Sequence, residues 1–211
     1  MDARKKRRSA WFFATLGGLF AAFAIVAGVA DDGASAPVTE VRTSGSRVLV
    51  VYYSRTGTTA RLGHAIADRA GADIEALADT VERRGAMGLL RSLGDAIGHR
   101  RTTLVPRRLD PSRYDLVVLG TPVWGDSVSA PMRAYLEDER EHLPTNVAFF
   151  LTDGYSSHDT VFTEMATLSG REPRATLGMA HDDVVAGRYA SQVERFVHTL
   201  AGPQAPLQAA R

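Results

Sequence analysis

One segment, residues 48–67, constrains the fold of this chain more than any other. Its first six residues, 48–53, are apolar or aromatic and rich in β-branched types, which is typical of a strand buried on both faces. Hydroxyl residues and one glycine follow, and residues 60–67 then take up a helical period. This order of strand, tight turn and helix indicates an α/β protein with a parallel sheet.

The turn between that strand and that helix also predicts a binding site for an anion. Backbone N–H groups at the start of a helix lack partners within the helix, and the helix dipole adds partial positive charge there. A glycine in the turn lets the backbone come close to a ligand. The turn has an arginine but no lysine, so it lacks the arrangement that grips a triphosphate, and a terminal monophosphate suits it better. The candidate phosphate-binding residues are Ser54, Arg55, Thr56, Gly57, Thr58 and Thr59.

The amino-acid composition excludes several kinds of reactive site. The 211 residues include no cysteine, which excludes disulfides, thiol catalysis and iron–sulfur clusters with cysteine ligands. The six histidines are scattered without metal-ligand spacing, so no metal site is predicted. Any redox chemistry must therefore be carried by a bound organic cofactor.

The first 30 residues predict a membrane anchor. Five basic residues at positions 4–8 precede 21 uncharged residues, 10–30, and about 20 apolar residues suffice for a helix to span a bilayer. The basic cluster should stay in the cytoplasm, so we expect a single-pass protein of the cell membrane with its domain outside the cytoplasm. The alternative is a signal peptide that is cleaved after export, because small residues suitable for cleavage lie at 28–30.

The rest of the chain divides into three parts. Residues 31–45 read as a flexible tether, 46–201 as one globular domain and 202–211 as a disordered tail. After residue 30 the chain has 20 basic and 23 acidic residues, and this mildly acidic balance argues against nucleic acid as a partner.

Further strands are predicted near residues 72–77, 114–120, 146–151 and 175–179, with helices between them. Within the less regular stretch 79–109, apolar residues recur at helical spacing and arginines flank them. We interpret this stretch as an exposed crossover helix with a basic face. A basic lip beside a ligand and a contact with an anionic membrane surface are the alternatives.

Three unusual loops follow predicted strands, at 54–59, 121–126 and 152–156. In a sheet of this kind, ligands bind beyond the carboxyl ends of the strands. The first loop suits a phosphate, the second brings the aromatic Trp124, and the third exposes backbone N–H groups at a glycine. Together these features suit a flat heteroaromatic ring on a phosphorylated chain. The dinucleotide fingerprint G-x-G-x-x-G is absent, and FMN fits all three loops. The candidate ring-contacting residues are Thr121, Pro122, Val123, Trp124, Gly125, Thr152, Asp153, Gly154 and Tyr155.

These loops resemble those of the flavodoxin family in their order and spacing. The S-R-T-G-T-T turn is similar to the family's phosphate loop, and G-T-P-V-W at 120–124 is similar to its second loop, whose aromatic residue lies against the flavin ring. The third loop departs from the pattern, because Asp-Gly-Tyr-Ser-Ser stands where the stand-alone branch of the family has paired glycines. The resemblance covers residues 46–201 and implies a doubly wound, five-stranded parallel sheet in the order 2-1-3-4-5.

The resemblance also implies a function. We expect an FMN-binding redox protein, tethered to the membrane, that exchanges electrons with a quinone or a protein partner. An electron carrier and a quinone reductase both remain open within that reading. The alternative is a flavodoxin-like domain that has lost flavin and acts as a binding module.

Overall fold

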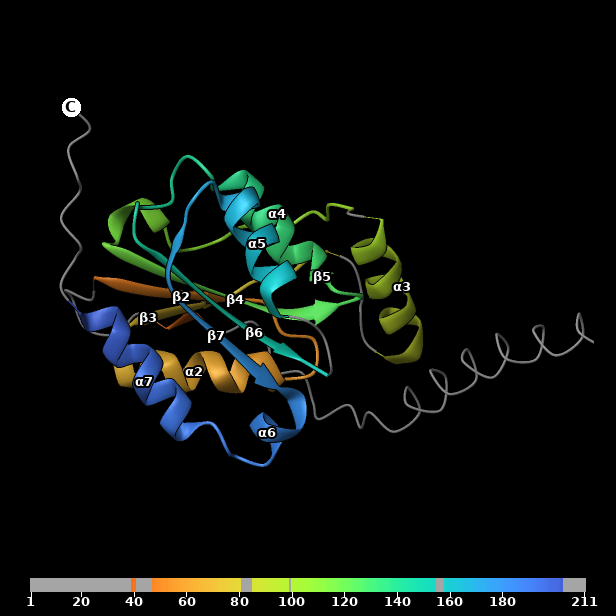
Figure 1. Ribbon diagram of the computed structural model, residues 1–211. Helices are drawn as coiled ribbons and strands as arrows, with labels where there is room; N and C mark the ends of the chain where they lie inside the picture. The colour runs from red at the N-terminus through yellow and green to blue at the C-terminus, as the bar shows by residue number, and fades with distance from the viewer. Residues whose placement is uncertain (1–38, 41–46, 81–84, 99, 155–157, 203–211) are drawn as a thin grey trace, which may run out of the picture.

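The computed structural model describes residues 39–40, 47–80, 85–98, 100–154 and 158–202 (Figure 1). Its centre is a parallel sheet of five strands covered by helices on both faces. In spatial order, the strands are β3 (Asp73–Ala76), β2 (Val48–Tyr52), β4 (Leu116–Trp124), β6 (Val147–Asp153) and β7 (Pro173–Ala180). This is the predicted order 2-1-3-4-5, so the doubly wound fold class is confirmed.

The predicted number of strands was wrong, because the sheet has seven. Strand β1 (Thr39–Glu40) pairs antiparallel with β3, and β5 (Ser127–Val128) pairs antiparallel with β4. Each has only two residues, too few for a hydrophobic alternation that a sequence could display. Strand β1 falls inside the segment predicted as a tether.

The helices divide between the two faces of the sheet. Figure 1 shows α2 (Thr58–Ala70) and α7 (Ala190–Ala201) on one face, and α4 (Ala130–Asp138) and α5 (His158–Ser169) on the other. The short α6 (His181–Val185) follows β7, and a 3-10 turn, Pro111–Arg113, precedes β4. Helix α3 (Gly85–Ile97) packs against β4, β5 and α4.

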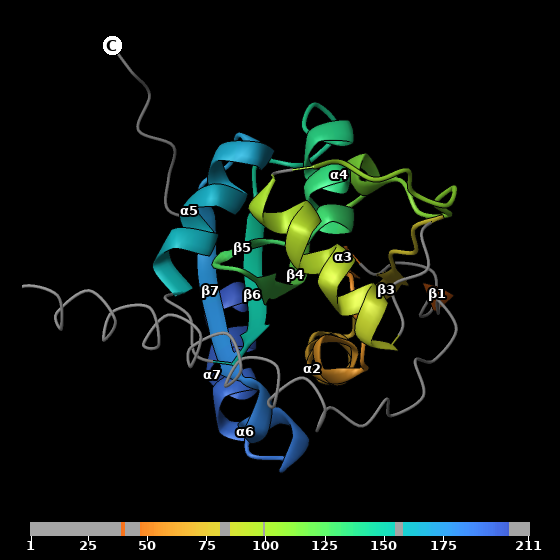
Figure 2. The same cartoon turned by 90° about the vertical axis from the view of Figure 1, so that its right-hand side faces the viewer.

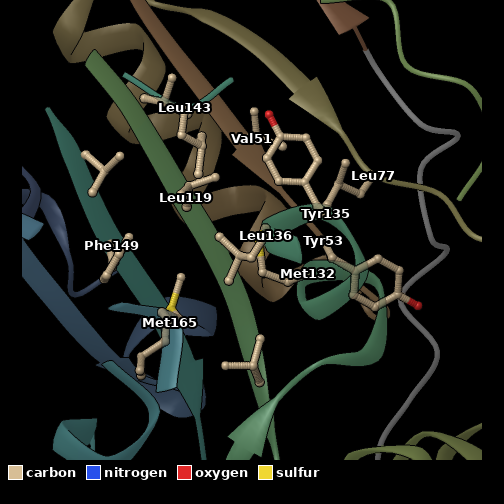
Figure 3. Close-up of a cluster of buried hydrophobic side chains, with 14 of the residues drawn as sticks. Val51, Tyr53, Leu77, Leu119, Met132, Tyr135, Leu136, Leu143, Phe149 and Met165 are labelled. Atoms are coloured by element: carbon tan, nitrogen blue, oxygen red, sulfur yellow. The ribbon is translucent and has the colours of Figure 1, made fainter. Parts of the chain in front are cut away.

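Each face of the sheet has its own core, because neighbouring residues of a strand point to opposite faces. Val51 and Leu119 belong to the core under α4 and α5, where Figure 3 shows them beside Tyr135 and Leu136. Val50 belongs to the core under α2 and α7. Strands buried on both faces explain the unbroken apolar runs in the sequence.

The predicted membrane anchor, residues 10–30, lies outside the described residues, as do most of the predicted tether and nearly all of the predicted tail. Within the described part of the chain, every helix is too short or too polar to span a bilayer.

Candidate functional site

The N-terminus of α2 lies directly after strand β2, at the point where the strand order reverses. Gly57 is its N-cap residue and has a φ of 91°, a left-handed conformation that glycine adopts without steric cost. No side chain caps this helix end. The Gly57 N–H donates to Ser54 Oγ over 3.1 Å, and the Gly57 carbonyl accepts from Arg61 N over 2.9 Å. The turn is therefore closed by the Ser54 hydroxyl, and the first-turn amides of α2 are left without a side-chain cap.

The two threonines that begin α2 tie the first loop to other strand ends. Thr59 is buried, and its Oγ1 lies 2.7 Å from Oγ1 of Thr152 at the end of β6. Thr58 Oγ1 lies 3.0 Å from Nδ1 of His181, the first residue after β7. The structure thus brings together the predicted first and third loops and adds His181, a residue that the sequence analysis left among the scattered histidines. The signal that could have found it is its place directly after a strand.

The second loop is a β-hairpin. Strand β4 continues through Trp124, turns at Gly125 and Asp126, and returns as β5. Both turn residues have positive φ, 56° and 57°, as the two-residue hairpin turn of type I′ requires. The indole of Trp124 is 7% exposed and meets the Tyr53 ring edge to face, with 5.6 Å between ring centroids. Trp124 therefore packs into the core of the α4 and α5 face.

The remaining residues of this loop have different surroundings. Thr121 is fully buried; its hydroxyl lies 2.9 Å from Ser129 Oγ and accepts from Ser129 N, so it supports the start of α4. Pro122 and Val123 are half-buried, and Gly125 is exposed. The exposed part of the second loop is thus the turn itself.

A buried charged network holds this hairpin in place. Glu164 of α5 accepts from Ser127 Oγ and from Val128 N, each over 2.9 Å, and pairs with the Arg133 guanidinium of α4. Arg133 also donates to Ser127 Oγ over 3.0 Å. Its side chain is 6% exposed and that of Glu164 is 18% exposed. This network has no local signal in the sequence, because Glu164 lies 31 or more residues from each of its partners.

The third loop begins at Asp153, a buried residue whose Oδ2 lies 3.1 Å from Nε2 of His158. His158 packs on Gly178 of β7, where a Cβ would lie 2.1 Å from its Nδ1. The absence of a side chain at this position of β7 makes room for the imidazole. Gly154 is exposed, and Tyr155 lies outside the described residues.

One tyrosine below the loops is held neutral. Burial and the nearby Glu40 carboxylate raise the pKa of Tyr52 to about 12, and its hydroxyl lies 3.4 Å from His64 Nε2.

A cavity of about 490 Å³ lies away from the three loops. It is lined by residues 101–107 and Asp138, none of which belongs to those loops.

The first loop fits a phosphate group. A helix N-terminus without a side-chain cap, opened by a left-handed glycine, presents backbone donors and positive dipole charge to an anion. The fit at the ring is less complete, because the Trp124 indole is engaged with Tyr53. The exposed Gly125 and Gly154 backbones lie at neighbouring strand ends, where a ring could meet them.

Neither a protein-family model nor a curated protein sequence matches this chain. Solved structures do. The chain is similar to a flavoprotein from Lactobacillus acidophilus in complex with FMN, with a TM-score of 0.57 and 19% identity over 72% of this chain and 99% of that one.

Two further structures agree with it. A candidate flavoprotein from Bacteroides uniformis gives a TM-score of 0.60 at 21% identity, over 74% of this chain and 99% of that one. Another candidate flavoprotein, from Bacteroides eggerthii, gives a TM-score of 0.53 at 21% identity, over 68% of this chain and 96% of that one. At such identities the likeness shows the fold, and the fold that the flavodoxin resemblance implied is confirmed.

Proposed function

We propose that this chain binds FMN and serves as a membrane-tethered redox protein. The observation that carries this proposal is the end of α2. A helix without a side-chain cap starts at a left-handed glycine directly after β2, next to β4, and its Thr59 contacts Thr152 at the end of β6. Ligands of doubly wound sheets bind at this position, where the strand order reverses.

The residues of the first loop have distinct roles in this proposal. The amides of Thr58 and Thr59 donate to the phosphate, and Gly57 provides the close approach. The Thr59 hydroxyl is committed to Thr152, so it positions the loop against β6. FMN, when bound, supplies the transfer of one or two electrons, which this cysteine-free chain needs from a cofactor.

The hairpin and the third loop hold the ring. Gly125, exposed at the turn of the hairpin, and Gly154 offer backbone to the ring edge. Asp153 and the exposed Asp126 place negative charge near it, which disfavours an anionic reduced ring and lowers its potential. That Trp124 lies against the ring stays a prediction; in the structure this indole supports the hairpin from inside the core.

The electron partner is a quinone or a protein that approaches the ring edge directly. The chain has no cysteine with which to hold an electron-relaying cluster. The uncharged run at 10–30 supports tethering, and a bilayer places the domain near lipid-soluble quinones.

The direct test is the visible spectrum of the full chain, purified in detergent and mixed with FMN, FAD or riboflavin. We expect a bound yellow flavin, with FMN preferred over FAD and over riboflavin, which lacks the phosphate. A colourless protein that takes up none of them would support the alternative, a domain that has lost flavin and acts as a binding module.

A substitution tests the position of the phosphate. Gly57→Asp should abolish FMN binding, because it adds both bulk and negative charge where the phosphate lies. Gly71→Asp is the matched control: this glycine also has positive φ, 60°, ends the same helix, and has open space around its Cβ position. Equal FMN affinity of the two variants would mean that the phosphate binds elsewhere.

A further inference from the structure

Helix α3 exposes large apolar side chains to solvent. Its sheltered side carries small residues, Gly88 and Ser92, and the Ser92 hydroxyl donates to the Gly88 carbonyl over 2.8 Å. Three of its large apolar residues face solvent: Met87 is 77% exposed, Leu90 51% and Leu93 38%. A surface helix normally turns its apolar stripe toward the core.

The three exposed residues form one row. They are spaced by three, so they lie on neighbouring positions of one side of the helix. They account for three of the five large hydrophobic residues that are exposed in the described part of the chain. A contiguous exposed apolar row, unlike scattered single residues, marks a surface that is covered by something else.

Positive charge accompanies this row. From residue 87 to residue 108 the sequence has five arginines and one acidic residue, Asp95. Arg101 is paired with Glu137 and Asp138, and Arg107 with Glu139.

Arg91 and Arg100 keep their charge available. Arg91, on α3 itself, and Arg100, just after it, are exposed, and neither forms an ion pair with another described residue. An apolar row with uncompensated cations beside it is complementary to a surface that is both apolar and anionic.

Helix α3 lies beside the second loop. It packs against β4, β5 and α4, beside the hairpin that forms the second loop. Figure 2, viewed toward the carboxyl ends of the strands, shows α3 in front of β4 and α4. Whatever covers the row therefore lies next to the candidate ligand site.

We propose that α3 is an interfacial helix that docks on an anionic lipid surface. Met87, Leu90 and Leu93 enter the boundary between headgroups and acyl chains, and Arg91 and Arg100 lie among the anionic headgroups. Flexible apolar side chains without a shaped pocket favour lipid over a structured protein partner. Docking would bring the β4–β5 hairpin to the membrane surface, and it requires neither bound flavin nor the N-terminal anchor.

The test uses the full chain, which has no cysteine of its own, so a single introduced cysteine carries a nitroxide spin label. Leu90→Cys reports on α3, and His198→Cys, exposed on α7 at the opposite face of the sheet, is the control. Vesicles contain phosphatidylcholine alone or with one third phosphatidylglycerol. With anionic vesicles we expect the label at 90 to become accessible to oxygen and shielded from a polar nickel reagent, while the label at 198 stays accessible to the nickel reagent.

Charge variants separate docking from anchoring, because the N-terminal run can hold the chain on either kind of vesicle. Each of Arg91→Gln and Arg100→Gln should weaken docking roughly fivefold, since a basic residue near an anionic surface contributes about 1 kcal/mol. Arg195→Gln, an exposed change on α7, should have no effect.

Three outcomes would overturn the proposal. Shielding at 90 that grows with protein concentration in the absence of lipid would indicate a second copy of the chain. Shielding without lipid at every concentration would indicate coverage by the chain's own segments. A label at 90 that stays accessible to the nickel reagent on both kinds of vesicle would exclude lipid docking, whatever the result for flavin binding.

Discussion

At the scale of single residues, the strongest ion pair outside the loops joins the buried Arg133 to the mostly buried Glu164. Glu164 accepts from Ser127 and Val128 as well, so it connects α4 and α5 with the β4–β5 hairpin. Removing one partner of a buried pair leaves the other charge without compensation. We therefore expect Glu164→Gln to lower the free energy of unfolding by about 2–4 kcal/mol, as measured by urea denaturation.

The chain offers a matched control for that change. Glu194 forms an ion pair with Arg69 at 3.4 Å, but the two side chains are 71% and 48% exposed. Exposed pairs contribute little, so Glu194→Gln should change the free energy of unfolding by less than about 0.5 kcal/mol. If the two variants were equally stable, the buried network would not be what holds the hairpin.

Gly120 allows a second comparison at this scale. A Cβ at Gly120 would lie 2.0 Å from Cζ of Phe150 on the neighbouring strand β6. Gly120→Ala should therefore destabilise the fold by about 3 kcal/mol, because an overpacked strand interior must move. Gly94→Ala in α3 meets open space and should stabilise by about 0.5–1 kcal/mol.

Urea denaturation of both alanine variants measures this difference. The double variant Gly120→Ala with Phe150→Leu should lose less stability than the two single losses added together, since both act on one contact. Additive losses would show that the Phe150 ring is not what excludes a side chain at this position.

At the scale of elements, Glu75 couples strand β3 to the segment before β4. It is 2% exposed, and its carboxylate accepts from Arg108 N over 2.7 Å and from Leu109 N over 3.4 Å. Burial raises the pKa of Glu75, and these two amides and the nearby arginines oppose part of that rise. In the folded protein the carboxyl therefore keeps its proton to a higher pH than in the unfolded chain.

The sign of the pH effect follows from this shift. The contribution of Glu75 to stability is greatest below its ordinary pKa, near 4.5, and falls as the pH rises through the higher folded value. The Gln side chain of Glu75→Gln cannot ionise. The free energy of unfolding of this variant, relative to that of the unchanged protein, should therefore increase as the pH rises from 4 to 7. Urea denaturation across this range measures the difference, and a constant difference would contradict the raised pKa.

The elements also show what a sequence can and cannot predict. The helical period predicted at 60–67 lies within α2, because the glycine before it and its apolar spacing are local signals. The strand β5 was missed, although Gly125 and Asp126 form the turn that creates it. That Trp124 faces a ligand stays a prediction; what the sequence did not indicate is that the hairpin pairs this residue with Ser127 and buries it. Burial depends on where the chain returns, and two residues of strand carry too little pattern to predict that return.

At the scale of the whole molecule, the strand order could be predicted, because the loops resemble those of flavodoxins and that family has one of the few topologies that right-handed crossovers leave open. The contacts among the loops could not. Thr59 and Thr152 are 93 positions apart, and Thr58 and His181 are 123 apart. Only the assembled sheet brings these side chains to one edge, so a sequence predicts that loops meet there without predicting which side chains join them.

The last prediction concerns the placement of the whole chain at a membrane. The basic cluster at 4–8 and the uncharged run at 10–30 predict a cytoplasmic N-terminus and a domain on the other side. With a C-terminal epitope tag, the chain should fractionate with membranes and resist extraction by alkaline carbonate. When the layers outside the cell membrane are removed and the membrane itself is left intact, added protease should destroy the tag.

Changing the five basic residues at 4–8 to glutamine supplies the control, because orientation depends on this charge bias. In that variant a larger share of the tag should survive protease. A mature chain that is soluble and shorter by about 30 residues would indicate a cleaved signal peptide, and a full-length chain that is soluble or fully shielded from protease would contradict the tether. An anchored chain with a protease-sensitive tag and a cleaved, soluble chain both have the domain outside the cytoplasm. There it must either fold around its flavin before export or bind flavin that is present there.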